Sequence, residues 1–116
     1  MNEQAQVKLY VRDFLKSQRL VIVACVALVL WLSLSYLVYR FEVNAVKANI
    51  TSYPIALWWG IVTGLTVGYG DTYPVTTGGR IVAGFMMFTG VIGIGIITAK
   101  ISAIFLADVL DRKSVV

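Results

Sequence analysis

The six residues Thr66-Val67-Gly68-Tyr69-Gly70-Asp71 carry a glycine at every second position, at 68 and 70. In an ordinary strand successive carbonyl groups point to opposite sides. Carbonyls that all face one line therefore require alternate residues at backbone angles that side chains disfavour. Gly68 and Gly70 can adopt those angles. The stretch predicts a row of main-chain oxygens directed at a single axis.

The composition is that of a membrane protein. Of the 116 residues, 59% are hydrophobic and 14% are charged, and the mean hydropathy is +0.82. That is too apolar for a typical soluble domain. The chain has no histidine, one cysteine (Cys25) and six acidic residues that occur singly, so it offers no paired-carboxylate site, disulfide framework or metal cluster. We expect neither an enzyme nor a nucleic-acid partner.

Two uncharged runs are long enough to cross a bilayer. Residues 20–39 would extend about 30 Å as a helix and predict an outer transmembrane helix. A second run begins after Arg80 and predicts an inner helix over 80–107. Ahead of them, residues 1–18 place apolar side chains at i, i+3, i+4 and i+7, which predicts an amphipathic interfacial helix, with a solvated tail as the alternative. Those side chains are Val7, Tyr10, Val11 and Phe14.

Between the two spans, residues 54–66 predict a short helix that enters the membrane without crossing it. Its apolar part, from about Pro54 to Leu65, would extend only about 18 Å. Pro54 suits its first turn, and glycines at 60, 64, 68 and 70 become dense where a spanning helix would continue. Such backbone is tolerated at membrane depth only inside protein or around a cavity. The fold class is therefore an all-α membrane protein, with two transmembrane helices flanking a re-entrant half-helix, in one domain over 1–116.

The basic residues predict the topology. Two spans and a re-entrant loop put both termini on one side, together with seven of the ten basic residues. An excess of Lys and Arg marks the cytoplasmic side, so both termini are expected there. The seven residues are Lys8, Arg12, Lys16, Arg19, Lys100, Arg112 and Lys113.

The chain resembles the potassium channel family in its two-transmembrane, prokaryotic-type form. The matching string runs from Ala56-Leu57-Trp58-Trp59 through Thr66–Asp71 to Tyr73-Pro74-Val75-Thr76 and Gly79-Arg80. The resemblance implies that potassium ions are coordinated in a filter over 66–71 by the carbonyls of Thr66, Val67, Gly68 and Tyr69. One loop offers too few oxygens to surround an ion, so three further copies are expected to complete a homotetramer in the lipid bilayer of the plasma membrane.

The same resemblance assigns supporting roles around the filter. Trp58 and Trp59 would form an aromatic cuff, with Gly70 and Asp71 as further support. Because a buried indole N–H needs an acceptor, we expect Trp58 to donate to the Asp71 carboxylate. The chain departs from many members at Leu65, Gly64 and Val62, where a threonine, a larger residue and in some members a glutamate occur. The departures at Leu65 and Gly64 concern the packing behind the filter. Because of Val62, the inactivation behaviour of the members with a glutamate is not carried over to this chain.

On the inner helix the resemblance aligns Gly90 with the gating hinge and Thr98 with positions that line the cavity, and Gly95 is a second hinge candidate. Glycines in membrane helices also permit close packing, so both roles stay open for Gly90. The triplet Asn49-Ile50-Thr51 fits the glycosylation sequon, a pattern that is common by chance.

Two other functions remain open. The nearest is a non-selective monovalent cation channel, because filters that differ by one side chain can lose selectivity. The other is a non-conducting scaffold that associates through the Gly-x-x-x-Gly spacing of Gly60, Gly64 and Gly68. That scaffold would leave Tyr69, Gly70 and Asp71 unexplained.

Overall fold

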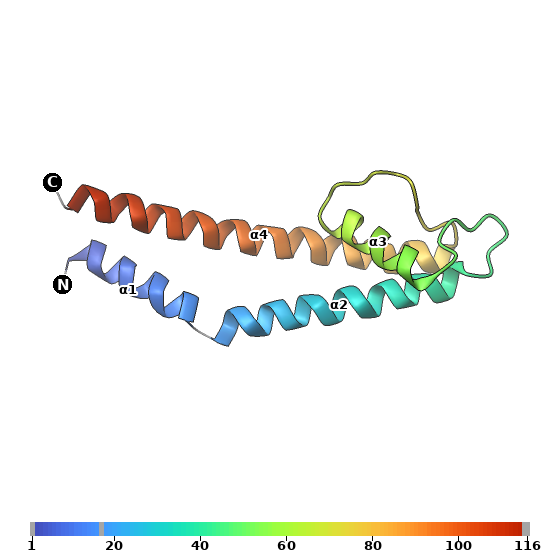
Figure 1. Cartoon of the computed structure of the whole chain (residues 1–116), viewed down its shortest axis with the longest axis horizontal. Helices are drawn as coiled ribbons and strands as arrows, with labels where there is room; N and C mark the ends of the chain where they lie inside the picture. The colour runs from blue at the N-terminus through green and yellow to red at the C-terminus, as the bar shows by residue number, and fades with distance from the viewer. Residues whose placement is uncertain (1, 17, 115–116) are drawn as a thin grey trace. The chain divides into compact units, whose positions relative to one another are not determined.

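The computed structural model describes residues 2–16 and 18–114. Within these residues the chain forms only helices: α1 (Glu3–Lys16), α2 (Gln18–Glu42), α3 (Tyr53–Gly64) and α4 (Thr77–Ser114) (Figure 1). They belong to two compact units. One is Val26–Ile94, and the other combines Met1–Cys25 with Gly95–Val116. The first unit contains α3 and every residue of the expected filter.

α2 and α4 are the two described helices that are long and apolar enough to cross a membrane. Their candidate spans are Val21–Glu42 and Thr77–Lys113, with mean hydropathies of 2.6 and 2.2. Only 11% of each apolar window is buried in the single chain. Both helices therefore leave large apolar faces for lipid or for other protein.

α4 is longer than the expected range of 80–107, because a cap at Thr76 begins it earlier and the charged residues after 107 remain helical. Thr76 precedes the helix, and its Oγ1 accepts a hydrogen bond of 2.9 Å from the Gly79 amide. At the other end Asp108 and Arg112 form an i,i+4 pair at 3.5 Å, which is compatible with a continuing helix.

α3 covers Tyr53–Gly64, where we expected 54–66. Ser52 caps its beginning, since the Ser52 Oγ accepts from the Ile55 amide at 3.4 Å, and Pro54 lies in the first turn. The helix ends early because Thr66 has a φ of 62°, which a right-handed helix cannot contain. Thr66 belongs to the segment that follows.

A small hydrophobic core joins α2, α3, α4 and the loop after α2 within the unit Val26–Ile94. Ile50 in this loop is completely buried, and Trp59 of α3 is 3% exposed. The core consists of Val38, Ile50, Ala56, Trp59, Ala83 and Met86. It anchors both α3 and the loop that leads into it.

Gly60 allows α3 to approach α2 closely. A Cβ at this position would lie 2.5 Å from the Ser35 Oγ and 3.0 Å from two atoms of the Trp31 indole. The Trp31 Nε1 donates to the Leu57 carbonyl at 3.2 Å, which joins the same two helices. Ser35 is fully buried, and its hydroxyl has no hydrogen-bond partner among the described residues.

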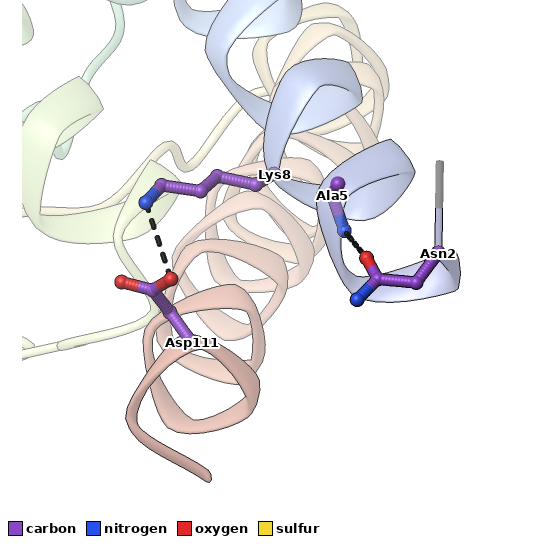
Figure 2. Close-up of polar contacts among 4 residues, drawn as sticks. All are labelled: Asn2, Ala5, Lys8 and Asp111. Atoms are coloured by element: carbon purple, nitrogen blue, oxygen red, sulfur yellow. Dashed lines mark hydrogen bonds and ion pairs between the residues drawn. The ribbon is translucent and has the colours of Figure 1, made fainter. Parts of the chain in front are cut away.

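In the other unit α1 is joined to the last part of α4. Lys8 forms an ion pair with Asp111 at 3.2 Å (Figure 2). The same view shows the Asn2 Oδ1 accepting from the Ala5 amide at 2.9 Å, which caps the beginning of α1. The side chains of Lys8 and Asp111 are 63% and 45% exposed, so this pair contributes little stability alone.

The expected apolar stripe of α1 can be followed in part. Val7 and Val11 are half-buried and Tyr10 is exposed, whereas residues 1 and 17 and the side chain of Phe14 lie outside the described part of the chain. The interfacial location of this helix remains a prediction.

The Gly60 contact predicts a steric effect on stability. Gly60→Ala should lower the free energy of unfolding by about 1–3 kcal/mol, because the new methyl group overlaps Ser35 and Trp31. Thermal unfolding of the purified protein in detergent measures this. Ser35→Ala removes the overlapping hydroxyl and should restore part of the loss in the double variant.

Gly64→Ala is the matched control, because no atom lies within 4 Å of a Cβ at Gly64. Equal melting temperatures for Gly60→Ala and Gly64→Ala would show that close approach at Gly60 is unimportant.

Candidate functional site

The expected filter has an alternating backbone. Thr66, Gly68 and Gly70 have φ values of 62°, 61° and 80°, and these are the only positive φ values among the described residues. Alternation of left-handed residues with ordinary ones turns successive carbonyl groups toward one side. The positive φ expected of Gly68 and Gly70 is confirmed.

The positive φ of Thr66 is the feature of the filter that sequence reasoning missed. A β-branched residue with positive φ is strained, by about 1–2 kcal/mol. Threonine therefore gives no local signal for this conformation. The only available signal was the spacing of Gly68 and Gly70. If every second residue of the segment has a positive φ, the residue before Gly68 in this series is Thr66.

The end of α3 supports the beginning of the filter. The Thr66 amide donates to the Thr63 carbonyl at 3.1 Å, and the amides of Val67 and Gly68 donate to the Val62 carbonyl at 2.9 and 3.2 Å. These bonds use carbonyls that would otherwise lack partners at the helix terminus. They also place the negative end of the α3 dipole directly behind the filter.

Trp58 and Asp71 are joined as expected. The Trp58 Nε1 donates to the Asp71 Oδ2 at 2.9 Å, which confirms the predicted hydrogen bond. The Trp58 and Tyr69 rings are stacked, with centroids 6.0 Å apart and planes inclined by 9°. Trp58 thus contacts the filter through a ring and a carboxylate, whereas Trp59 lies in the hydrophobic core.

The segment from Asp71 to α4 is held by side chains. Asp71 Oδ1 accepts from the Thr72 amide at 3.0 Å, and the Asn49 Oδ1 accepts from the Tyr73 amide at 2.6 Å. The two Glu42 oxygens accept from the Val75 and Thr76 amides at 2.9 and 2.8 Å. Pro74 has no amide hydrogen, so every backbone N–H from 72 to 76 has a side-chain acceptor.

Glu42 is a supporting residue that sequence reasoning missed. It is fully buried, although it is charged, and it also accepts from the Thr76 hydroxyl at 2.7 Å. Its carboxylate lies at the beginning of α4, where three donors and the positive end of the helix dipole compensate a negative charge. The sequence feature that could have indicated this role is a single carboxylate at the end of an apolar helix.

The candidate gating residues lie in different surroundings. A Cβ at Gly90 would collide with the Gly64 carbonyl oxygen and lie 2.8 Å from the Gly64 Cα, so α4 and the end of α3 are in close contact. No atom lies within 4 Å of a Cβ at Gly95. Gly95 and Thr98 belong to the other compact unit, and both are exposed.

One copy of the chain supplies one wall of a site. All residues from Thr66 to Asp71 are exposed, and Tyr69 is 68% exposed. The wall consists of backbone carbonyls with ring, carboxylate and amide support behind them. Oxygen ligands without a proton-transfer group suit a hard cation and not acid–base chemistry.

The comparisons with known proteins agree with this geometry. The model of the family described as "Ion channel" matches residues 26–107. The potassium voltage-gated channel subfamily A member 7 of Homo sapiens is 48% identical over 59 residues, which are 51% of this chain and 13% of that protein. The delayed-rectifier potassium channel regulatory subunit KCNS3 of Mus musculus is 39% identical over 71 residues, or 61% of this chain and 14% of that protein.

A solved structure is also similar. It is the crystal structure of a voltage-gated K+ channel pore module in a closed state in lipid membranes, with a TM-score of 0.64 and 39% identity. The match covers 78% of this chain and 93% of that one. The chain spans about one seventh of the length of the curated relatives.

The family, the fold and the filter geometry indicate a channel and not an enzyme. The protein is an all-α membrane protein in which two transmembrane helices flank a pore helix and a filter. The chain therefore belongs to the ion channel family, as a potassium channel pore domain.

Proposed function

We propose that four copies of this chain form a potassium-selective pore that conducts K+ passively across the plasma membrane. The observation that carries the proposal is the alternation of positive φ at Thr66, Gly68 and Gly70. The carbonyls of Thr66, Val67, Gly68 and Tyr69 replace the hydration shell of K+, and the Thr66 hydroxyl adds a ligand at the inner end. Fourfold symmetry supplies the oxygens that one wall lacks.

The surroundings of the filter support this function. The exposed apolar faces of α2 and α4 contact lipid and neighbouring copies, and both termini lie in the cytoplasm with most of the basic residues. Trp58, Asp71 and Gly70 keep the filter open from behind, and Trp59 fixes the pore helix in the core. Gly90, Gly95 and Thr98 are residues of α4, the inner helix.

The scaffold alternative receives no support from the helix bounds. Gly60 packs against α2 of the same chain, and Gly68 lies beyond the end of α3 with a φ of 61°. The three glycines of the Gly-x-x-x-Gly spacing therefore do not form one helix face. A non-selective cation channel would have the same filter backbone, so this alternative is distinguished from a selective one by measuring ion selectivity.

Flux through the purified chain tests the function. Reconstituted vesicles should take up K+ along its gradient, barium or a quaternary ammonium ion should block the uptake, and the reversal potential in mixed solutions should favour K+ over Na+. Gly68→Ala should abolish selective flux because alanine disfavours positive φ, whereas Gly64→Ala is the control. Equal Na+ and K+ permeability would establish the non-selective alternative.

The assembly is tested with the same preparation. The similar proteins include regulatory subunits of potassium channels. The chain is therefore measured without a second channel protein, so that only assembly with copies of itself is tested. We expect a fourfold mass by light scattering together with flux. A different stoichiometry would contradict the proposed homotetramer.

The Trp58 hydrogen bond predicts an effect on filter stability. Trp58→Phe keeps a ring next to Tyr69 but removes the donor to Asp71, so currents should decay about threefold to tenfold faster, as expected for one lost hydrogen bond. Single-channel recording measures this decay. Trp31→Phe removes an indole donor that binds the Leu57 carbonyl and not a filter residue, and it is the matched control. If the two variants behave alike, the Trp58 donor has no special role.

The Gly90 contact predicts an effect on gating. Gly90→Ala places a methyl group against the Gly64 backbone and should shift the open probability several-fold, about the effect of 1 kcal/mol. Gly95→Ala introduces a methyl group into open space and should have a smaller effect. Open probabilities are compared in single-channel recordings, and an unchanged value for Gly90→Ala would remove Gly90 from gating.

A further inference from the structure

The loop between α2 and α3 reaches the outer end of the filter through one side chain. Of the three side chains that accept backbone hydrogen bonds from residues 72–76, Asp71 is part of the segment and Glu42 ends α2. Asn49 alone comes from the loop, and its bond to the Tyr73 amide is 2.6 Å long. It is also the only uncharged acceptor of the three.

The position of Asn49 is fixed by its neighbours. Ile50 follows it directly and is fully buried in the core with Trp59 and Met86. Ser52 then begins α3 as its N-cap. The backbone at Asn49 is therefore held in place by the core and by the beginning of α3, so the carboxamide is already positioned for its hydrogen bond.

The Tyr73 amide lies two residues beyond Asp71. Thr72 between them is already bound to the Asp71 carboxylate, and Pro74 on the other side cannot donate. Without Asn49 the Tyr73 amide would have no acceptor among the residues that the structure describes, and the stretch from Thr72 to Pro74 would be free to move. That movement would pull on Asp71 and its bond to Trp58.

We propose that Asn49 is a positioning residue for the potassium filter, acting through the Tyr73 amide to fix the outer end of the loop that carries Asp71. This inference rests on the proposed function. It gives the Asn49-Ile50-Thr51 triplet a structural role: its central residue is buried in the core, and its asparagine oxygen is bound to the protein's own backbone. Carbonyls that repel one another are stabilised by the ions between them, so weaker support makes conduction depend more on external K+.

The test compares variants of similar size. Asn49→Leu removes the acceptor, Asn49→Asp retains an oxygen in the same place, and Asn44→Leu makes the same change at an exposed asparagine of the same loop. Asn49→Leu should speed current decay about threefold to tenfold, as expected for one hydrogen bond, and raised external K+ should reverse the effect. Asn49→Asp and Asn44→Leu should resemble the unmodified channel, and all variants should remain tetrameric.

The donor can be removed from the other side. Replacing Tyr73 by its α-hydroxy acid turns the amide N–H into an ester oxygen and leaves Asn49 in place. This variant should show the same faster decay, and combining it with Asn49→Leu should add nothing, because both changes remove one bond. Additive effects, or unchanged decay in the ester variant, would overturn the proposal.

Hydrogen exchange separates this inference from the proposed function. In Asn49→Leu the protection of the Tyr73 amide should fall about tenfold, whereas the Val75 and Thr76 amides, bound to Glu42, should change little. This readout does not require conduction. Loss of Tyr73 protection in a chain that carries no K+ would refute the function and leave the Asn49 contact standing, and unchanged protection would refute the contact itself.

Discussion

The structure depends on finding partners for the polar backbone of a segment that is neither helix nor strand. Inside a membrane such groups cannot turn to water, and each one left without a partner is costly. At the inner end, the amides of Thr66, Val67 and Gly68 use carbonyls at the end of α3. At the outer end, the amides of Thr72, Tyr73, Val75 and Thr76 donate to side chains. The filter can therefore exist only where α3, the end of α2 and the preceding loop surround it.

This requirement explains how the helices are arranged around the site. Glu42 joins the last turn of α2 to the first turn of α4, since its carboxylate binds Thr76 and a Cβ at Gly79 would collide with it. Glycine has two separate uses here. At Gly68 and Gly70 it provides positive φ, and at Gly60 and Gly90 it provides space for backbone approach.

The sequence predicts the parts of this structure that depend on local chemistry. Apolar length predicts α2 and α4, Pro54 and the glycines predict a short α3, and an indole beside a carboxylate predicts the Trp58 bond. It does not predict the roles of Asn49 and Glu42, because their partners lie 24 and 33 or more residues away and are mainly backbone amides, which all residues except proline have. It misplaces the end of α3 because Thr66 adopts a conformation that threonine disfavours.

At Thr66 the filter has a side chain where the backbone conformation favours glycine. Glycine would adopt the same φ without strain, as it does two and four residues later. A threonine at this position retains a hydroxyl and a methyl group, but its backbone conformation is strained. In a fourfold assembly the same strain would be present in all four copies, at one level of the pore. The innermost ring of the pore would then store conformational energy in its resting geometry and release it if the carbonyls rotated away from the axis.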